Sequence, residues 1–157
     1  MADYSEAFAT GEWPLAKFYF RVTIDGMSEL GFQAVEGLES EISVMEYRPG
    51  NSPLFFKSKR YGMMTFSNIT LKKGMFATDA ELKDWWDLFA WQHEDRSTRR
   101  AILIELLDEK GDTKISWDVK GCFPAKFTPT SLDAEADSEV AIEELEVVCE
   151  SWTVEIA

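Results

Sequence analysis

Side chains with the chemistry of catalysis or metal binding are few in this sequence. His93 is the only histidine, which excludes a two-histidine metal site and proton transfer by a histidine pair. Cys122 and Cys149 are the only cysteines, and they lack the CxxC spacing of a zinc site. Cysteines in buried strands are commonly inert. We therefore predict no catalytic role for the histidine or for either cysteine.

The acidic residues also lack a catalytic or calcium-binding pattern. Asp108-Glu109 and Glu143-Glu144 are adjacent pairs, and adjacent strand residues point to opposite faces, so such carboxylates do not converge on one bond. The acidic stretch 108–118 lacks the opening Asp-x-Asp of an EF-hand loop. Neither a GxxxxGK[ST] loop nor a GxGxxG turn occurs. The sequence thus predicts no catalytic residue, no cofactor and no metal ion.

Charge, in contrast, is strongly segregated along the chain. The 29 acidic and 16 basic residues give a net charge of −13, which disfavours stable binding to nucleic acid. Residues 48–64 nevertheless carry only basic charges, and the chain after Lys126 carries only acidic ones. One interpretation is that the basic and acidic residues form ion pairs within the chain and that the remaining charges keep it soluble. The other is that the basic stretch of one copy contacts an acidic face of the next, in a head-to-tail contact that closes into rings.

These charges lie on a strand-rich framework. Asp25-Gly26 predicts a turn that joins the first two strands in a hairpin, and residues 109–112 predict a second hairpin. A change of phase near Glu143-Glu144 predicts a β-bulge, and turn-forming residues predict a long loop over 48–64. Alternating apolar and polar residues predict strands over 16–25, 30–35, 38–47, 65–72, 99–107, 115–119, 139–149 and 152–156.

One helix is predicted in the middle of the chain, over residues 79–94. Thr78 and Glu81 match a capping box. An apolar stripe follows at i, i+3, i+4 and i+7, formed by Leu82, Trp85, Trp86 and Phe89. The predicted fold is therefore mainly β with one covering α-helix, as a sandwich of sheets or a barrel.

The length of 157 residues, with 45% hydrophobic residues, suits one domain with its own core. Residues 1–14 mix small and polar groups and end at Pro14, so we interpret them as an N-terminal arm that leads into the first strand. They carry no Lys or Arg and lack the apolar segment of a signal peptide, so we expect no export by the general secretory route. No window approaches 18 uninterrupted apolar residues, so we expect no membrane-spanning helix.

Five blocks of sequence resemble the inner tube proteins of contractile phage tails and extracellular contractile injection systems. The resemblance runs from about Trp13 to Ile156, and the order and spacing of the blocks carry it. The blocks are Pro14–Val22, Glu46–Gly50, Phe66–Gly74, Asp84–Trp86 and Glu139–Glu143.

The resemblance implies the tail-tube fold, in which two packed antiparallel sheets roll into a barrel-like sandwich flanked by a helix. It further implies that six subunits form a ring and that rings stack into a hollow tube inside a contractile sheath. Contraction would drive the tube through a target envelope to deliver cargo. The implied partners are other copies of the chain, a sheath protein, baseplate or tube-initiator and terminator proteins, and luminal cargo.

This resemblance also implies assembly in the bacterial cytoplasm, followed by residence in an extracellular, cell-anchored or virion particle. Three alternatives stay open. The first is a tube initiator that joins the tube to the baseplate, and the second is a type VI secretion tube protein. The third, from a different class, is an unrecognised enzyme.

Two groups of residues are candidate sites for assembly. The basic and aromatic residues of the long loop are expected to contact neighbouring subunits. Polar strand faces are expected to line the lumen, because a conduit for macromolecules needs a wall without apolar patches. The contact residues are Arg48, Phe55, Phe56, Lys57, Lys59 and Arg60, and the lumen candidates are Glu39, Glu41, Ser43, Glu144 and Glu146.

Overall fold

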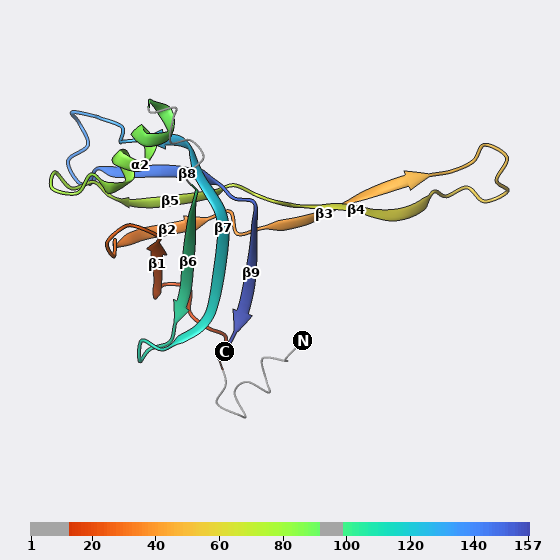
Figure 1. The fold of residues 1–157 in the computed structure, drawn as a ribbon, viewed down its shortest axis with the longest axis horizontal. Coiled ribbons are helices and arrows are strands. Elements are labelled where there is room, and N and C mark those ends of the chain that lie inside the picture. The colour runs from red at the N-terminus through yellow and green to blue at the C-terminus, as the bar shows by residue number, and fades with distance from the viewer. Residues whose placement is uncertain (1–12, 92–98) are drawn as a thin grey trace.

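The computed structural model describes residues 13–91 and 99–157. Within these ranges the chain forms nine strands and one helix, α2 (Glu81–Ala90), as Figure 1 shows. The strands are β1 (Phe20–Ile24), β2 (Phe32–Glu36), β3 (Ser40–Tyr47), β4 (Ser58–Phe66), β5 (Ile69–Gly74), β6 (Arg100–Leu107), β7 (Thr113–Thr128), β8 (Ile142–Val148) and β9 (Ser151–Ile156). The predicted mainly-β fold is confirmed.

Two antiparallel sheets share the long strand β7. Its first half lies between β6 and β9, and β6 also pairs with β1. Its second half pairs with β8, and β5 and β2 complete this sheet. In Figure 1 the first sheet runs vertically and the second horizontally, so β7 bends from one into the other. Gly121 occupies the bend with a φ of +66°, a left-handed conformation that favours glycine.

The core lies between the two sheets and under α2. Strands β1, β6 and β7 contribute one side of it, strands β5 and β8 contribute the other, and each strand buries alternate residues as the period of two requires. The fully buried apolar residues include Val22, Ile69, Leu71, Leu82, Trp85, Ile102, Val119, Leu145 and Val147.

Helix α2 packs its apolar stripe on β7. Leu82, Trp85 and Phe89 are buried, and Trp86 is half-buried and stacked on Phe127 with ring centroids 6.4 Å apart. The predicted stripe is therefore confirmed, whereas the predicted capping box is wrong. Ala80 occupies the N-cap position, and the Asp79 carboxylate accepts a hydrogen bond from the Glu81 amide at 3.3 Å.

The second predicted hairpin, β6–β7, is confirmed, but the first is wrong. A turn does follow β1, where the Met27 amide donates to the Ile24 carbonyl at 3.1 Å. Strand β1 then pairs with β6, and β2 pairs with β5 in the other sheet. The turn therefore carries the chain from one layer to the other, because a turn signal fixes only the local direction of the chain and not the partner of the next strand.

The predicted bulge near Glu143-Glu144 is also wrong. Strand β8 keeps an unbroken register with β5, and the irregularity lies on β7 between Pro124 and Lys126. Glu143 shares the buried face of Leu145 and Val147. The apparent change of phase is therefore a buried carboxylate and not an inserted residue.

Candidate self-assembly surface

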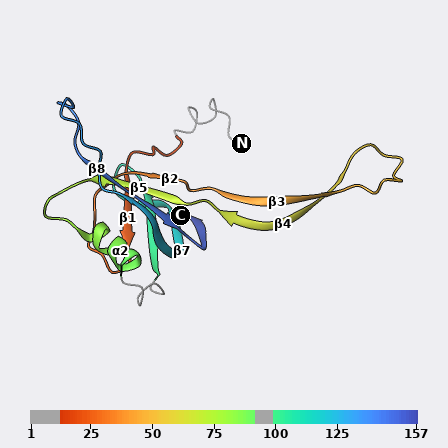
Figure 2. The same ribbon diagram turned by 90° about the horizontal axis from the view of Figure 1, so that it is seen from above.

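Strands β3 and β4 form a two-stranded sheet of their own that projects far from the body (Figures 1 and 2). We call residues 40–66 the arm hairpin. The predicted loop over 48–64 therefore needs correction, because residues 58–64 belong to strand β4. Residues 58–64 show no readable alternation because neither face of this part of the strand packs on a core, and burial of one face is what fixes a strand pattern.

One bulge and one glycine shape the arm hairpin. The register advances from Ile42 opposite Met64 to Val44 opposite Tyr61, so β4 carries the extra residue. A Cβ at Gly62 would lie 2.4 Å from the Ser43 hydroxyl oxygen, so any larger residue at position 62 would force the Ser43 side chain to move. That hydroxyl instead donates to the Met63 carbonyl at 3.2 Å. The bulge raises the local twist of the hairpin.

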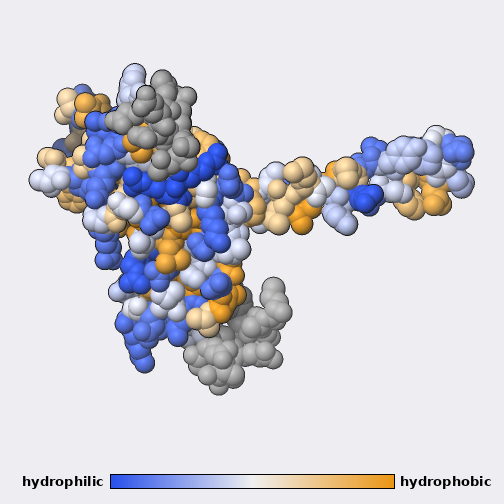
Figure 3. Space-filling view, in the orientation of Figure 1, coloured by the Kyte–Doolittle hydropathy of each residue, from blue (hydrophilic) through white to orange (hydrophobic). Residues whose placement is uncertain are grey.

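The surface of the arm hairpin is unusually apolar for an exposed element. Figure 3 shows hydrophobic patches along it, both near the body and at the tip. Phe55 is 93% exposed and Met63 is 81% exposed. The other large exposed hydrophobic residues are Ile42, Val44, Met45, Tyr47, Leu54, Phe56, Tyr61 and Met64. Exposed apolar patches of this kind mark an interaction site.

At the tip, Arg48 organises the connection between the strands. Its guanidinium donates to the Leu54 carbonyl at 2.9 Å and to the Ser52 carbonyl at 3.1 Å. It also lies 5.7 Å from the centroid of the Phe55 ring. These contacts close the tip and keep the aromatic ring on the outside, so Arg48 acts first as a local organiser.

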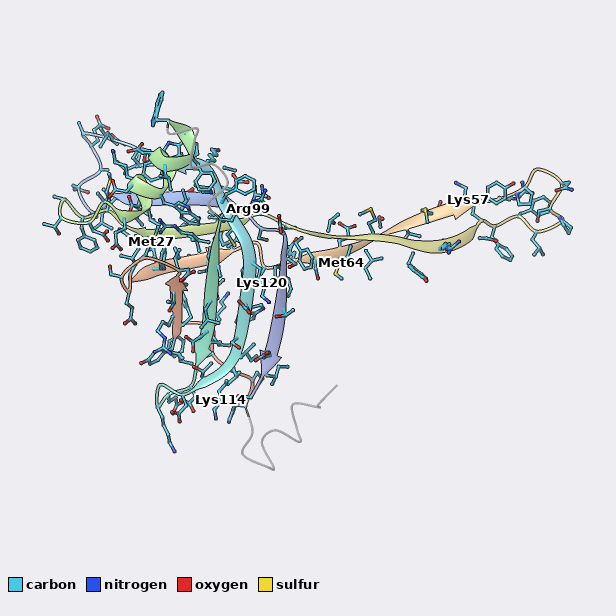
Figure 4. The ribbon with its side chains drawn as sticks, viewed as in Figure 1. Met27, Lys57, Met64, Arg99, Lys114 and Lys120 are labelled. Carbon is cyan, nitrogen blue, oxygen red and sulfur yellow. The ribbon has the colours of Figure 1, made fainter. Side chains whose placement is uncertain are left out.

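The predicted contact residues all lie together at the outer part of the arm hairpin. Lys57, labelled in Figure 4, forms an exposed ion pair with Glu46 at 3.5 Å. Within residues 13–91 and 99–157, Lys59 and Arg60 have no carboxylate within ion-pair distance and are exposed. The outer hairpin therefore presents aromatic side chains next to unpaired positive charge.

The predicted lumen residues fall into two places. Glu144 and Glu146 lie on the outer face of β8, where Lys72 is 3.8 Å from Glu144 and the Asn68 side-chain Nδ2 donates to the Glu146 carboxylate at 2.9 Å. Glu39 lies at the root of the arm hairpin, where its carbonyl accepts from the Ser67 amide at 3.1 Å. Glu41 and Ser43 lie out along β3. These residues therefore do not share one strand face.

Segregated charge is partly neutralised within the chain. The Lys73 ammonium is buried and lies 2.6 Å from the Glu143 carboxylate and 3.1 Å from Asp79. Burial alone would lower the pKa of Lys73, but these two hydrogen-bonded carboxylates outweigh it and the pKa is raised. The interpretation as ion pairing within the chain thus holds for Lys73. The basic residues of the outer arm hairpin, in contrast, form no ion pair with the described residues of the body.

A second ion pair lies on β1 and β6. Arg21 donates to both oxygens of Glu105, at 3.1 and 3.2 Å, and Thr113 donates to the same carboxylate. The hydrogen bonds from Arg21, and then from Thr113, hold the pKa of Glu105 below its usual value. Sequence reasoning missed this pair because its members lie 84 positions apart.

Among the described residues, no three His, Cys, Asp or Glu side chains lie close enough to hold a metal ion. His93 lies outside those residues. The part of the chain that the structure covers has no helix of the length and hydrophobicity needed to cross a bilayer.

Solved structures with the same arrangement of sheets and helix are tube and cap proteins of contractile injection systems, which places the chain in the tail-tube class. A chain in the extended sheath–tube complex of PVC, an extracellular contractile injection system, superposes with a TM-score of 0.81 at 26% identity, and the match covers 100% of both chains. A chain in the tube-terminating cap of the anti-feeding prophage superposes at 0.80 with 27% identity, covering 93% of each chain. Hcp1 from Flavobacterium johnsoniae superposes with a TM-score of 0.52 at 10% identity, and the match covers 89% of this chain and 97% of Hcp1. This similarity shows a shared fold and nothing more.

Residues 16–153 match the family described as T4-like virus tail tube protein gp19, and the chain belongs to this family. The resemblance seen in the sequence is thereby confirmed. No curated protein matches the chain at a significant level.

Proposed function

We propose that this chain is the inner tube subunit of a contractile injection particle or phage-like tail. Six copies form a ring, and rings stack into a hollow tube that a contractile sheath drives through the target envelope with its cargo. Membership of the tail tube family and the full-length similarity to a chain of the PVC sheath–tube complex support this role. Residues 1–157 act as one tail-tube domain, with residues 1–14 as an arm.

The arm hairpin is the observation that carries the proposal. Two-stranded hairpins are at best marginally stable alone in water, and this one exposes aromatic and methionine side chains on strands that reach the core only at Phe66. Contact with other copies would bury these side chains. The unpaired charges of Lys59 and Arg60 would then meet acidic surface of a chain whose net charge is −13.

The wall of the channel would be polar and acidic. Glu39, Glu144 and Glu146 remain candidates for it, together with Glu41 and Ser43 on β3. An acidic wall repels most acidic macromolecules and adheres little to unfolded chains, which suits transit. A map of the tube with a lumen lined by Lys and Arg, or by exposed aromatic rings, would contradict this part.

We assign no catalytic role to the chain, in keeping with a family of structural tube proteins. The particle is extracellular in the systems that its structural neighbours come from. Assembly would take place in the bacterial cytoplasm before the particle is released, anchored to the cell or built into a virion. Its partners would be sheath, baseplate, initiator and terminator proteins.

Electron microscopy of the purified full-length chain tests the proposal. The wild type should form rings or tubes, and reversal of Lys57, Lys59 and Arg60 to Glu should abolish stacking while the thermal unfolding midpoint stays unchanged. Reversal of Lys83, Lys110 and Lys120 to Glu makes the same change of net charge away from the arm hairpin and serves as the matched control. Normal polymerisation of the hairpin variant at physiological salt would contradict the role of the hairpin.

A second candidate is a terminal ring, either an initiator at the baseplate or a terminator. The similarity to a chain in the anti-feeding prophage cap structure favours it about as strongly as the similarity to the PVC sheath–tube chain favours the main tube. The length of the assemblies that the purified chain forms distinguishes a main tube subunit from a terminal one. A main tube subunit grows into long tubes alone, whereas a terminal subunit stops at one or two rings.

A further inference from the structure

Two buried cysteines, Cys122 and Cys149, lie at the bend that joins the two sheets. Strand β7 pairs with β8 up to Phe123 opposite Val148, and with β9 from Lys120 opposite Ser151. Continuing the β7–β8 register by one residue places Cys122 opposite Cys149. Opposite residues of an antiparallel pair have Cα atoms roughly 4.5–5.5 Å apart, which lies within the range that a disulfide spans.

Both side chains lie in the core. Cys122 is fully buried and Cys149 is 8% exposed, and both belong to the core cluster. Burial raises the pKa of Cys122 to about 12, with a smaller contribution from the neighbouring Cys149 thiol. Burial also raises the pKa of Cys149. Both groups are therefore neutral thiols at neutral pH, and both are reduced in the structure.

We propose that Cys122 and Cys149 form a redox modification site that closes to an intramolecular disulfide on exposure to a low-molecular-weight disulfide such as oxidised glutathione. The more accessible Cys149, as thiolate, attacks one sulfur of oxidised glutathione and releases one glutathione thiolate. Cys122, as thiolate, then attacks the Cys149 sulfur and releases the second. The two cysteines lose two electrons and two protons, and oxidised glutathione becomes two molecules of glutathione.

The site lies beside the root of the arm hairpin. The Cys149 thiol donates to the Ser67 carbonyl at 3.7 Å, and Ser67 directly follows β4. Next to it, the Phe66 ring packs edge-on against Trp152 with centroids 5.5 Å apart. Closure of the disulfide removes the thiol donor and fixes the corner between β8 and β9. The redox state thus acts on the segment from which the arm hairpin projects.

Tryptic mapping tests the proposal on the full-length reduced chain, incubated in its folded state with oxidised glutathione at about pH 8. Lys120 and Lys126 flank Cys122, and no Lys or Arg follows Lys126. A disulfide would therefore join peptide Gly121–Lys126 to peptide Phe127–Ala157, and the intact mass would fall by two hydrogen atoms. Titratable thiols should fall from two to none, and Tm should rise by roughly 5–12 °C.

Single alanine variants provide the controls. Cys122→Ala should keep a glutathione adduct on Cys149, because the resolving thiol is gone, and Cys149→Ala should react far more slowly. The proposal is overturned if the folded wild type keeps both thiols, if it stops at a stable glutathione adduct, or if the linked peptides come from two chains. None of these readouts depends on rings or tubes, so failure here is separable from failure of the proposed function.

Discussion

The buried Lys73–Glu143 pair allows a sharp test of how charge is accommodated in this fold. Replacement of Lys73 by Met removes the ammonium that lies 2.6 Å from the Glu143 carboxylate, whose side chain is only 4% exposed. An uncompensated buried charge costs about 3–5 kcal/mol of unfolding free energy. Lys73→Met should therefore be among the most destabilising single changes outside the apolar core.

Glu143→Leu should cost less, because Lys73 keeps three other contacts. Asp79 lies 3.1 Å from its ammonium, the Gly74 carbonyl accepts at 3.0 Å, and the Phe76 ring centroid is 5.6 Å away. The double variant Lys73→Met/Glu143→Leu should recover most of the loss, since a well-packed apolar pair often replaces a buried ion pair at little cost. We expect a coupling energy of about 1–3 kcal/mol.

Urea unfolding at pH 7 followed by tryptophan fluorescence measures these effects. At that pH the contribution of Lys73 is fully present, because its pKa is raised in the folded state and the stability is lost only as pH climbs through that value. Lys72→Met is the matched control. Lys72 is partly exposed, with Glu36 at 3.5 Å and Glu144 at 3.8 Å, so its loss should cost below about 1 kcal/mol. A loss for Lys73→Met no larger than that of the control, or additive single effects, would refute the reasoning.

Three further predictions concern the body. Trp85→Ala should cost about 3–5 kcal/mol in urea unfolding, and Trp86→Ala only about 1–2 kcal/mol, because Trp85 is 1% exposed and Trp86 is half-buried; equal losses would contradict the burial. Gly37→Ala should cost more than about 2 kcal/mol, since φ is +93° and the added Cβ would lie 2.1 Å from a backbone oxygen. The hydrogen bond from Arg21 lowers the pKa of Glu105 in the folded state. The ionised Glu105 carboxylate therefore stabilises the fold above about pH 4.3, and this stabilisation is lost as the pH falls from there through the folded-state pKa. The free energy of unfolding of Glu105→Gln should accordingly depend less steeply on pH in acid than that of the wild type.

Sequence patterns predicted those elements whose one face is buried. Strands β1, β6 and β8 alternate because their inner residues pack in the core, and α2 has a clear apolar stripe for the same reason. The choice of partner strand was not readable, because a turn fixes only the local direction of the chain. The turn at Gly26 is real, yet β1 and β2 join different sheets.

The buried ion pair had a signal that was misread. Ile69, Leu71 and Lys73 keep a period of two, and so do Glu143, Leu145 and Val147. A lysine and a glutamate, each in phase with the buried residues of its own strand, indicate a pair that crosses the core. Strand β4 gave no such signal, since most of its side chains are exposed in the single chain and would be buried only by contact with other copies.

The exposed side chains of the arm hairpin bear on how the subunits assemble. Burial of a large aromatic or aliphatic side chain contributes roughly 1.5–3 kcal/mol, so burial of Phe55 and Phe56 contributes about 3–6 kcal/mol per contact. Association costs about 4–15 kcal/mol in lost translational and rotational freedom. Burial of these two rings alone therefore falls short of most of that range, whereas a ring that engages several hairpins at once gains from each of them. Assembly should be cooperative, with a threshold concentration.

The variant Phe55→Ser/Phe56→Ser tests this reasoning. Both rings are exposed in the single chain, Phe55 at 93%, so urea unfolding of the monomer should change by less than about 0.5 kcal/mol. Loss of at least about 3 kcal/mol per contact should raise the threshold for assembly by 100-fold or more, because about 1.4 kcal/mol corresponds to a factor of ten. Light scattering over a concentration series measures the threshold. An unchanged threshold would mean that the tip stays in solvent within the assembly, and the free energy of stacking would then have to come from the body of the subunit.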